Sequence, residues 1–308
     1  MRLGGSMYRP NSIAEMDGMI EALDTYGLTA ITAPATWADM TDDDASAYGD
    51  RARQHGIVVG EAHHRPNLMH RDPGMRAARV EILRRGLLKA DVMGCRSVTI
   101  LVGTVGPEDH LAAPHPYMFT AEARAEFREV LLRAMDGLDL RHTKLLIEPW
   151  TNTFFYQPAA IREFLDSVGH PSVGLHLDQM NMVDQAHYYS TTDLINETFD
   201  LLEPYIGGVH FKDVRWDWHH MLLKFDEVLI GDGILDYHTY LSRAAKLDPE
   251  ITCYCEHLES EGDYAVNFAR LHRMVRELGT GFLTRTPAGA ADSAGEPAPA
   301  GAAAAAAA

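Results

Sequence analysis

The sequence predicts a single α/β domain folded as a (β/α)8 TIM barrel. Eight short, β-rich segments alternate with longer amphipathic segments, and no glycine-rich phosphate-binding turn follows any of the eight. Strict alternation of strand and helix indicates right-handed parallel crossovers. Eight such units favour a closed barrel over an open dinucleotide-binding sheet. A chain of 308 residues has the length of one large domain of this kind.

The predicted elements follow one another in a regular order. The first strand, RLGGS, is rich in glycine, which is unfavourable inside a strand. The strands are expected at residues 2–6, 28–33, 57–62, 96–102, 144–150, 172–178, 206–212 and 251–257. Asn11 and Ser12 are candidate caps for the first helix. Apolar residues recur at intervals of three and four, as in amphipathic helices, at residues 12–26, 75–93, 120–139 and 264–278.

The end of the chain differs in composition from the rest. Residues 285–308 contain Pro, Gly, Ala and a few polar residues, and no large apolar side chain that could enter a core. Such a composition is typical of a disordered segment. We therefore expect a catalytic barrel domain at residues 1–284 and a disordered tail at 285–308, with no domain boundary inside the barrel.

Composition limits the classes of partner. The chain has 27 Lys and Arg against 44 Asp and Glu, a net charge of −17, which argues against a nucleic-acid partner because phosphate binding relies on clustered basic residues. It has three cysteines without a CxxC pair, and no secretory signal is visible, so a cytoplasmic location is expected. No apolar run approaches the roughly 18 to 20 residues that span a bilayer, so no membrane partner is expected.

Four polar residues stand at the ends of the last four predicted strands. Glu148, Asp178 and Glu256 end strands five, six and eight, and His210 lies near the end of strand seven. The carboxyl ends of the strands form the face of a barrel that carries active sites. These four side chains are therefore expected to converge. The alternative, that each residue only caps its own strand, is weaker for four successive strands than for one.

Three carboxylates that converge would repel one another unless a cation held them. A divalent metal ion resolves this conflict, and oxygen with imidazole ligands suits Mn²⁺, Co²⁺, Mg²⁺, Fe²⁺ or Zn²⁺. We expect one such ion, with Mn²⁺ as the first choice. The absence of a cysteine ligand argues against a structural zinc site.

With these residues in place, the sequence resembles the xylose isomerase-like sugar isomerase and epimerase superfamily, which also contains the AP endonuclease family 2 type of barrel. The resemblance covers most of residues 1–280 and is strongest in the segments LLIEPW, VGLHLDQMNM, YIGGVHFKDV, EVLIGDGILDYHTYL and YCEHL. It implies metal ligands at Glu148, Asp178, His210 and Glu256. It also implies that Glu148 and Glu256 form the catalytic acid/base pair, on opposite sides of the reacting carbon.

The implied chemistry has a physical basis. A carbon next to a carbonyl is a weak acid, and a divalent ion stabilises the enediolate that forms when its proton leaves. A positioned carboxylate that takes this proton contributes about 10² to 10⁴ in rate. We therefore expect a metal-dependent isomerase or epimerase that acts on a small ketose or keto-sugar.

Three residues near the ligands are candidate substrate contacts. Asn181 stands where many ketose epimerases of the superfamily have a histidine, three residues after Asp178. Lys212 is two residues after His210, hence on the same face of the strand, and could neutralise an enediolate or bind an anionic group; the alternative is a solvated lysine beyond the strand end. Arg215 resembles a residue that contacts a sugar hydroxyl in some epimerases.

Further candidates lie after strands three and five. His63, His64 and His70 cluster in EAHHRPNLMH; His63 is expected to line the substrate pocket, and a second metal ion near His63 and His64 is an open alternative. Trp150, two residues beyond Glu148, could pack on a sugar face. The segment RWDWHHM, residues 215–221, is a candidate lid or contact of a homo-oligomer.

Other functions stay open at this stage. A dehydratase of a keto-inositol, or a lyase that cleaves a 3-keto-glycoside, would begin with the same proton abstraction. A nuclease is disfavoured by the negative charge. A non-catalytic binding subunit of a hetero-complex would need no metal site, and the retention of all four ligands speaks against it.

Overall fold

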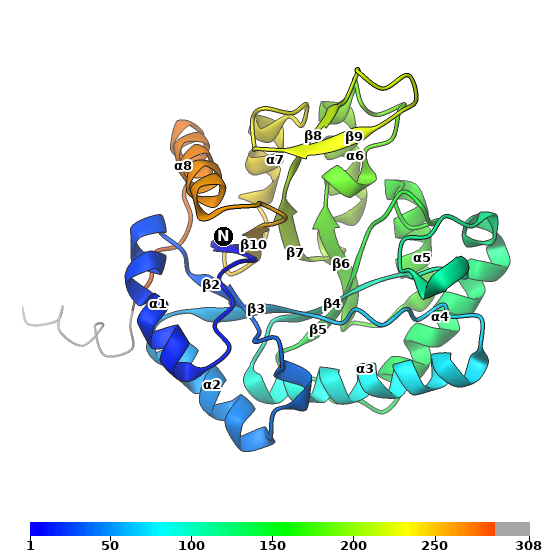
Figure 1. The fold of residues 1–308 in the computed structure, drawn as a ribbon, viewed down its shortest axis with the longest axis horizontal. Coiled ribbons are helices and arrows are strands. Elements are labelled where there is room, and N and C mark those ends of the chain that lie inside the picture. The colour runs from blue at the N-terminus through cyan, green and yellow to red at the C-terminus, as the bar shows by residue number, and fades with distance from the viewer. Residues whose placement is uncertain (287–308) are drawn as a thin grey trace, which may run out of the picture.

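The computed structural model describes residues 1–286, and the fold is a barrel of parallel strands surrounded by helices (Figure 1). The strand order in the sheet is β1-β10-β7-β6-β5-β4-β3-β2. The backbone N–H of Thr29 donates to the carbonyl of Leu3 at 2.9 Å, which joins the two edges. The strands are β1 (Arg2–Gly5), β2 (Ala30–Thr32), β3 (Val58–His63), β4 (Ser97–Leu101), β5 (Lys144–Glu148), β6 (Val173–Asp178), β7 (Ile206–Phe211) and β10 (Thr252–Cys255). The predicted (β/α)8 barrel is confirmed.

The glycine-rich first strand has a packing reason. A Cβ atom at Gly4 would lie 2.5 Å from the ring of Tyr254, a fully buried side chain. The hydroxyl of Tyr254 donates to the carbonyl of Ile31 at 2.8 Å. Glycine at this position therefore makes room for an aromatic side chain that connects β10 to β2 across the barrel.

The helices alternate with the strands and cover the outside of the barrel. They are α1 (Ile13–Tyr26), α2 (Asp42–Gln54), α3 (Pro73–Met93), α4 (Ala121–Met135), α5 (Pro158–Val168), α6 (Thr191–Leu202), α7 (Tyr237–Ala244) and α8 (Glu261–Glu277). Of the two expected caps, Ser12 is the N-cap of α1, and its hydroxyl accepts from the N–H of Glu15 at 3.1 Å. Short 3-10 turns lie at Trp37–Asp39, Pro107–Asp109, Pro116–Phe119, Met180–Met182 and Glu203–Tyr205.

A hairpin that the sequence did not predict as strands follows β7. Strands β8 (Asp213–Trp216) and β9 (Phe225–Val228) pair antiparallel outside the barrel sheet and extend beyond the ends of β6 and β7 (Figure 1). The buried carboxylate of Asp213 accepts from the N–H groups of Gly231, Gly233 and Leu235 at 2.9 to 3.2 Å. A Cβ at Gly233 would lie 2.1 Å from this carboxylate, so the glycine is needed for the loop to close on it.

The C-terminal boundary can be followed as far as residue 286. The guanidinium of Arg285 pairs with Asp24 and donates to the carbonyl of His55 at 2.9 Å, so this residue still contacts the barrel. The remainder of the expected tail, residues 287–308, lies outside the described residues. Within residues 1–286, no helix has the length and hydrophobicity that a membrane crossing requires.

Candidate active site at the carboxyl ends of the strands

The four expected ligand residues come together at the carboxyl end of the barrel. One ligand atom from each of Glu148, Asp178, His210 and Glu256 lies within 4.8 Å of the others, and all four side chains are buried. The sheet register explains this convergence, because Asp178 and Tyr254 both pair with His210 across adjacent strands, and Glu256 follows two residues after Tyr254. Residues separated by 30 to 46 positions in sequence thus form one cluster.

The imidazole of His210 presents one nitrogen to the carboxylates. Its Nδ1 lies 3.2 Å from Glu256 Oε2, 3.5 Å from Glu148 Oε1 and 3.7 Å from Asp178 Oδ2. Within residues 1–286, this buried Nδ1 and Asp178 Oδ2 form no hydrogen bond of good geometry. Buried polar atoms are normally satisfied, so a nitrogen and oxygens that face one shared point fit the ligand set of a divalent ion.

Lys212 is the cation at this point of the site. Its Nζ lies 2.8 Å from both Asp178 Oδ2 and Glu256 Oε2, and 3.7 Å from Glu148 Oε1. The side chain is only 4% exposed, so it is not the solvated lysine that was the alternative interpretation of the sequence. Burial alone would lower the pKa of Lys212, but the three carboxylates outweigh burial and raise the pKa well above its ordinary value.

The positive charges of His210 and Lys212 change the pKa values of the neighbouring carboxyl groups. Burial would raise the pKa of Glu256, but the facing charges of His210 and Lys212 lower it to about 2. Asp178 is also buried, and the same two cations lower its pKa from the ordinary value. Glu256 and Asp178 are therefore ionised at neutral pH and can act as ligands or as proton acceptors.

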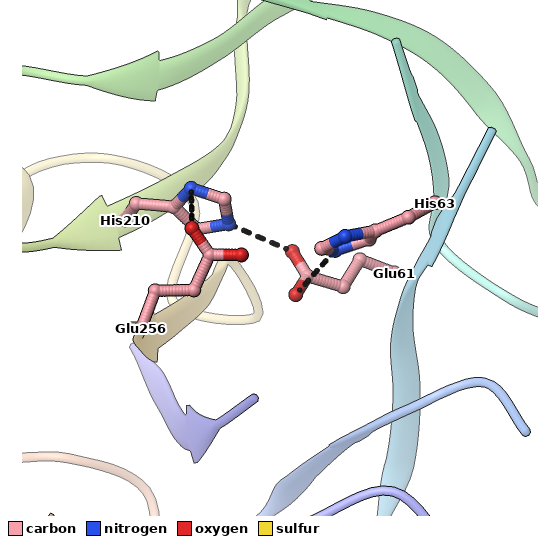
Figure 2. A group of neighbouring side chains, drawn as sticks. All are labelled: Glu61, His63, His210 and Glu256. Atoms are coloured by element: carbon pink, nitrogen blue, oxygen red, sulfur yellow. Dashed lines mark hydrogen bonds and ion pairs between the residues drawn. The ribbon is translucent and has the colours of Figure 1, made fainter. Parts of the chain in front are cut away.

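Glu61 on β3 was not among the predicted site residues. It is fully buried, with Oε2 3.2 Å from His210 Nε2 and Oε1 3.0 Å from His63 Nε2. Figure 2 shows its carboxylate between the two imidazoles. Burial would raise the pKa of Glu61, but His63 and His210 hold it well below the ordinary value. The signal in the sequence is a glutamate that interrupts the apolar segment IVVGEA.

His63 and Glu256 line a cleft of about 400 Å³ that opens from the mouth of the barrel. His63 comes from the end of β3, on the same face as Glu61, and its Nδ1 contacts the guanidinium of Arg65. Together, Glu61, His63, His210 and Glu256 also offer ligand atoms within 4.8 Å of one another. His63 thus lies beside the site, as its expected pocket role requires.

The other two histidines of this segment lie elsewhere. His64 is buried, with 5% exposure, and does not contribute to the ligand groups described above. His70 accepts from the N–H of Asp72 through Nδ1 at 3.0 Å, beside the start of α3. The structure therefore brings His63 to the site and leaves His64 and His70 outside it.

His64 should make the stability of the protein depend on pH. Burial lowers its pKa to about 4, so the unfolded chain binds more protons than the folded one below about pH 6.5. The stabilising contribution is complete above this pH and is lost as the pH falls towards 4. Between pH 7 and pH 5, wild type should lose about 2 kcal/mol more than His64→Gln in urea unfolding. Equal losses would contradict this prediction.

Two predicted substrate contacts lie beside Glu148. Asn181 donates from Nδ2 to Glu148 Oε1 at 2.9 Å, and its backbone N–H donates to Asp178 Oδ1 at 3.2 Å. Trp150 is half-buried and lines a cavity of about 540 Å³ together with Glu148 and Glu256. Asn181 therefore orients a carboxylate of the cluster, and Trp150 forms part of the wall of the cavity beside it.

Arg215 is not brought into the cluster. It is exposed on β8 of the hairpin, and no hydrogen bond or ion pair joins its side chain to the site within residues 1–286. The predicted lid segment forms the tip of the same hairpin, where Trp218 is 77% exposed. Trp216 packs instead against Tyr188 and Phe225.

His257 is a second residue that the sequence did not single out. It has a positive φ of 57°, which is uncommon for a residue other than glycine. Its Nδ1 lies 3.0 Å from Glu227 of β9, and its Nε2 lies 3.5 Å from Glu256 Oε2. The hydrogen bond with Glu227 raises the pKa of His257. His257 therefore connects the hairpin to the rim of the site.

Comparison with known proteins places this geometry in a family context. The model of the family described as xylose isomerase-like TIM barrel matches residues 20–284. Comparison with curated proteins gives no match.

Several solved structures share the fold. The 3-keto-D-glucoside 4-epimerase YcjR from E. coli is 15% identical, with 89% of this chain and 98% of that chain covered and a TM-score of 0.62. The probable 3-DHS dehydratase AsbF from Bacillus anthracis is 14% identical, with 83% and 92% covered and a TM-score of 0.61. Endonuclease IV from Thermus thermophilus is 16% identical, with 90% and 100% covered and a TM-score of 0.64. At these identities, the likeness extends to the fold alone.

Proposed function

The chain belongs to the xylose isomerase-like TIM barrel family, and we propose that it is a divalent-metal-dependent isomerase or epimerase of a small ketose or keto-sugar. One observation carries the proposal. Three buried carboxylates and the Nδ1 of a buried histidine come together at the mouth of the barrel, and two of the carboxylates, Glu148 and Glu256, line an open cavity. This ligand set fits a hard or borderline divalent ion.

Glu148, Asp178, His210 and Glu256 would hold the ion, with Mn²⁺ as the proposed occupant and Co²⁺, Mg²⁺, Fe²⁺ or Zn²⁺ as alternatives. When bound, the ion supplies Lewis-acid stabilisation of negative charge on the oxygens of a hydroxy-ketone. The ligand set contains no thiolate, in agreement with a site for oxygen-bearing substrates rather than for a structural zinc ion.

The residues of the chain would divide the remaining work. Glu148 and Glu256 both belong to the cluster, and each can take or return a proton at a carbon next to a carbonyl. Lys212 places a positive charge between them, where it would stabilise an anionic substrate oxygen. Trp150 and His63 line the clefts that lead to this point, and they would contact the rest of the sugar.

A dehydratase of a keto-inositol, or a lyase acting on a 3-keto-glycoside, is the second candidate. Such an enzyme needs an additional proton donor for the departing group. His257 lies beside Glu256 and is held by Glu227. Its N–H at the rim of the site would be this proton donor, and this observation supports the second candidate. A nucleic-acid substrate is disfavoured by the net charge of −17. A non-catalytic binding subunit would have no use for the converged ligands.

The proposal includes a cytoplasmic location, a small-molecule sugar partner and a homo-oligomer. The exposed apolar side chains at the hairpin tip support the last of these, because large apolar groups exposed together are typical of contact surfaces. These side chains are Trp218, Met221, Leu222 and Leu223.

Metal content tests the proposed site. Purified wild type should contain about one divalent ion per chain after incubation with Mn²⁺, because the ligands are preformed. His210→Ala should lose this ion, since it removes the imidazole that faces the three carboxylates. His220→Ala, which removes an exposed histidine of the hairpin tip, should retain it. Elemental analysis of the three proteins measures the result.

Deuterium uptake from heavy water then tests the chemistry. Wild type with Mn²⁺ should exchange a carbon-bound proton in at least one member of a panel of ketoses and keto-inositols, as measured by NMR. If the wild-type protein bound no metal even after incubation with Mn²⁺ or Co²⁺, this result would contradict the proposed function and favour the binding subunit.

A further inference from the structure

We propose that Glu61 is a positioning residue that fixes the tautomer and orientation of His210, so that Nδ1 rather than Nε2 serves as the ligand nitrogen. This inference rests on the proposed metal-dependent function and adds a residue to it. Glu61 lies two residues before the end of β3, and its Oε2 faces Nε2 of His210, whereas the carboxylates of the cluster face Nδ1. It would act through His210 without touching the ion or the substrate.

The position of Glu61 calls for a role other than packing. The side chain has no exposed surface, and a buried carboxylate is costly unless charged or hydrogen-bonded partners compensate it. No lysine or arginine pairs with it within residues 1–286. Its close partners are imidazoles: His210 Nε2 at 3.2 Å, His63 Nε2 at 3.0 Å and His176 Nε2 at 3.5 Å. Figure 2 shows the first two of these contacts.

The chemistry of imidazole explains what this carboxylate does to His210. An ionised carboxylate only accepts hydrogen bonds, so Glu61 keeps the proton on Nε2. A histidine nitrogen must give up its proton to act as a ligand. With Nε2 held in this way, the nitrogen that gives up its proton is Nδ1, which faces Glu148, Asp178 and Glu256. Carboxylates that bind the second nitrogen of a ligand histidine have this effect on many metal sites.

Neighbouring side chains hold the ring in the same orientation. The ring of His176 lies against that of His210, with centroids 4.0 Å apart. His176 is fully buried, and its Nδ1 lies 3.3 Å from the hydroxyl of Thr99. The Nε2 groups of His210 and His63 both lie at the Glu61 carboxylate, so one side chain orients both the ligand histidine and the histidine that lines the cleft.

Metal affinity tests the role of Glu61. Glu61→Gln keeps the size of the side chain and removes its charge, and its affinity for Mn²⁺ in calorimetric titration should be about 10- to 100-fold weaker than that of wild type. Thr252→Val changes a buried hydroxyl of the same barrel that forms no hydrogen bond within residues 1–286, and it should bind Mn²⁺ as wild type does. Thr252→Val thus separates a positioning role from a general disturbance of the core.

The outcomes separate this inference from the function on which it rests. Binding to Glu61→Gln with wild-type affinity, beside loss of binding in His210→Ala, would overturn the inference and leave the metal site intact. Absence of binding to wild type would overturn both.

A second measurement determines the tautomer of His210 in the wild-type protein itself. In wild type loaded with Zn²⁺, which is diamagnetic, ¹⁵N NMR of the histidine side chains should show His210 protonated at Nε2 and ligated through Nδ1. His210→Ala assigns the signal. A His210 signal with the proton on Nδ1 would overturn the inference whatever the affinity of Glu61→Gln.

Discussion

Glu148→Gln should lower turnover by about 10²- to 10⁴-fold, the usual contribution of a positioned proton acceptor, while the fold persists. The amide has the shape of the carboxylate but cannot accept a proton from a weak carbon acid. Glu148 is 4% exposed at the barrel mouth, and Asn181 orients its Oε1 through a hydrogen bond of 2.9 Å. The amide oxygen of glutamine can accept the same bond, so packing around the site should change little.

The measurement must separate the loss of the proton acceptor from the loss of a metal ligand, because Glu148 is proposed to have both roles. Turnover and deuterium uptake should therefore be compared at saturating Mn²⁺, with metal content determined on the same samples. Glu259→Gln is the matched control, since it makes the same chemical change at an exposed position on the rim and should leave turnover unchanged. Full activity of Glu148→Gln with bound metal would refute the two-glutamate mechanism.

The sequence was sufficient to predict the barrel because local patterns determine it. Apart from the glycine-rich first strand, the barrel strands are short and mainly apolar, and their helical neighbours show the period of three and four, so all eight strands could be placed. The hairpin β8–β9 could not be predicted in this way. Its strands carry mixed polar and aromatic residues, and Asp213, whose contacts with the loop around Gly233 tie the hairpin to the barrel, is far in sequence from its partners.

The ligand residues at the ends of the strands could be predicted because the strand ends themselves could be predicted. Glu148, Asp178 and Glu256 interrupt apolar strands at the mouth, and parallel strands bring such positions together. Glu61 also interrupts an apolar strand, but only the folded barrel brings it against His210 of β7. The conformation of Lys212 was also beyond the sequence. A lysine just past a strand end can extend into solvent or turn inwards, and the choice depends on the summed charge of residues from three other strands.

Lys212→Met should have the largest effect on the stability of the metal-free protein. Removal of one partner from a buried ion cluster costs about 3 to 5 kcal/mol, because the remaining charges lose their compensation. Here the ammonium is within 2.8 Å of two carboxylates and 3.7 Å of a third. Methionine fills a similar volume without charge. Urea unfolding of the metal-free variant should show this loss.

The same substitution should strengthen metal binding. A divalent ion must lie about 2.0 to 2.2 Å from the carboxylate oxygens that Lys212 now contacts, so the ion and the ammonium compete for them. At about 4 Å, the repulsion between a single and a double positive charge is about 8 kcal/mol at an effective dielectric constant of 20. Even a small part of this energy would raise the affinity of Lys212→Met for Mn²⁺ by about tenfold or more. Turnover should nevertheless fall, because the charge that would stabilise the substrate oxygen is gone.

Lys224→Met is the control for both measurements. Lys224 is on the hairpin, partly exposed, and pairs with Asp217 and Asp226 at 3.0 and 2.9 Å, so its loss removes a charge near the mouth but not from the ligand oxygens. It should change neither stability by more than about 1 kcal/mol nor metal affinity. If Lys212→Met bound Mn²⁺ no more tightly than Lys224→Met, the ammonium would not compete for the ligand oxygens. Tighter binding with lower turnover, in contrast, would mean that the chain keeps Lys212 at the expense of metal affinity because catalysis requires its charge.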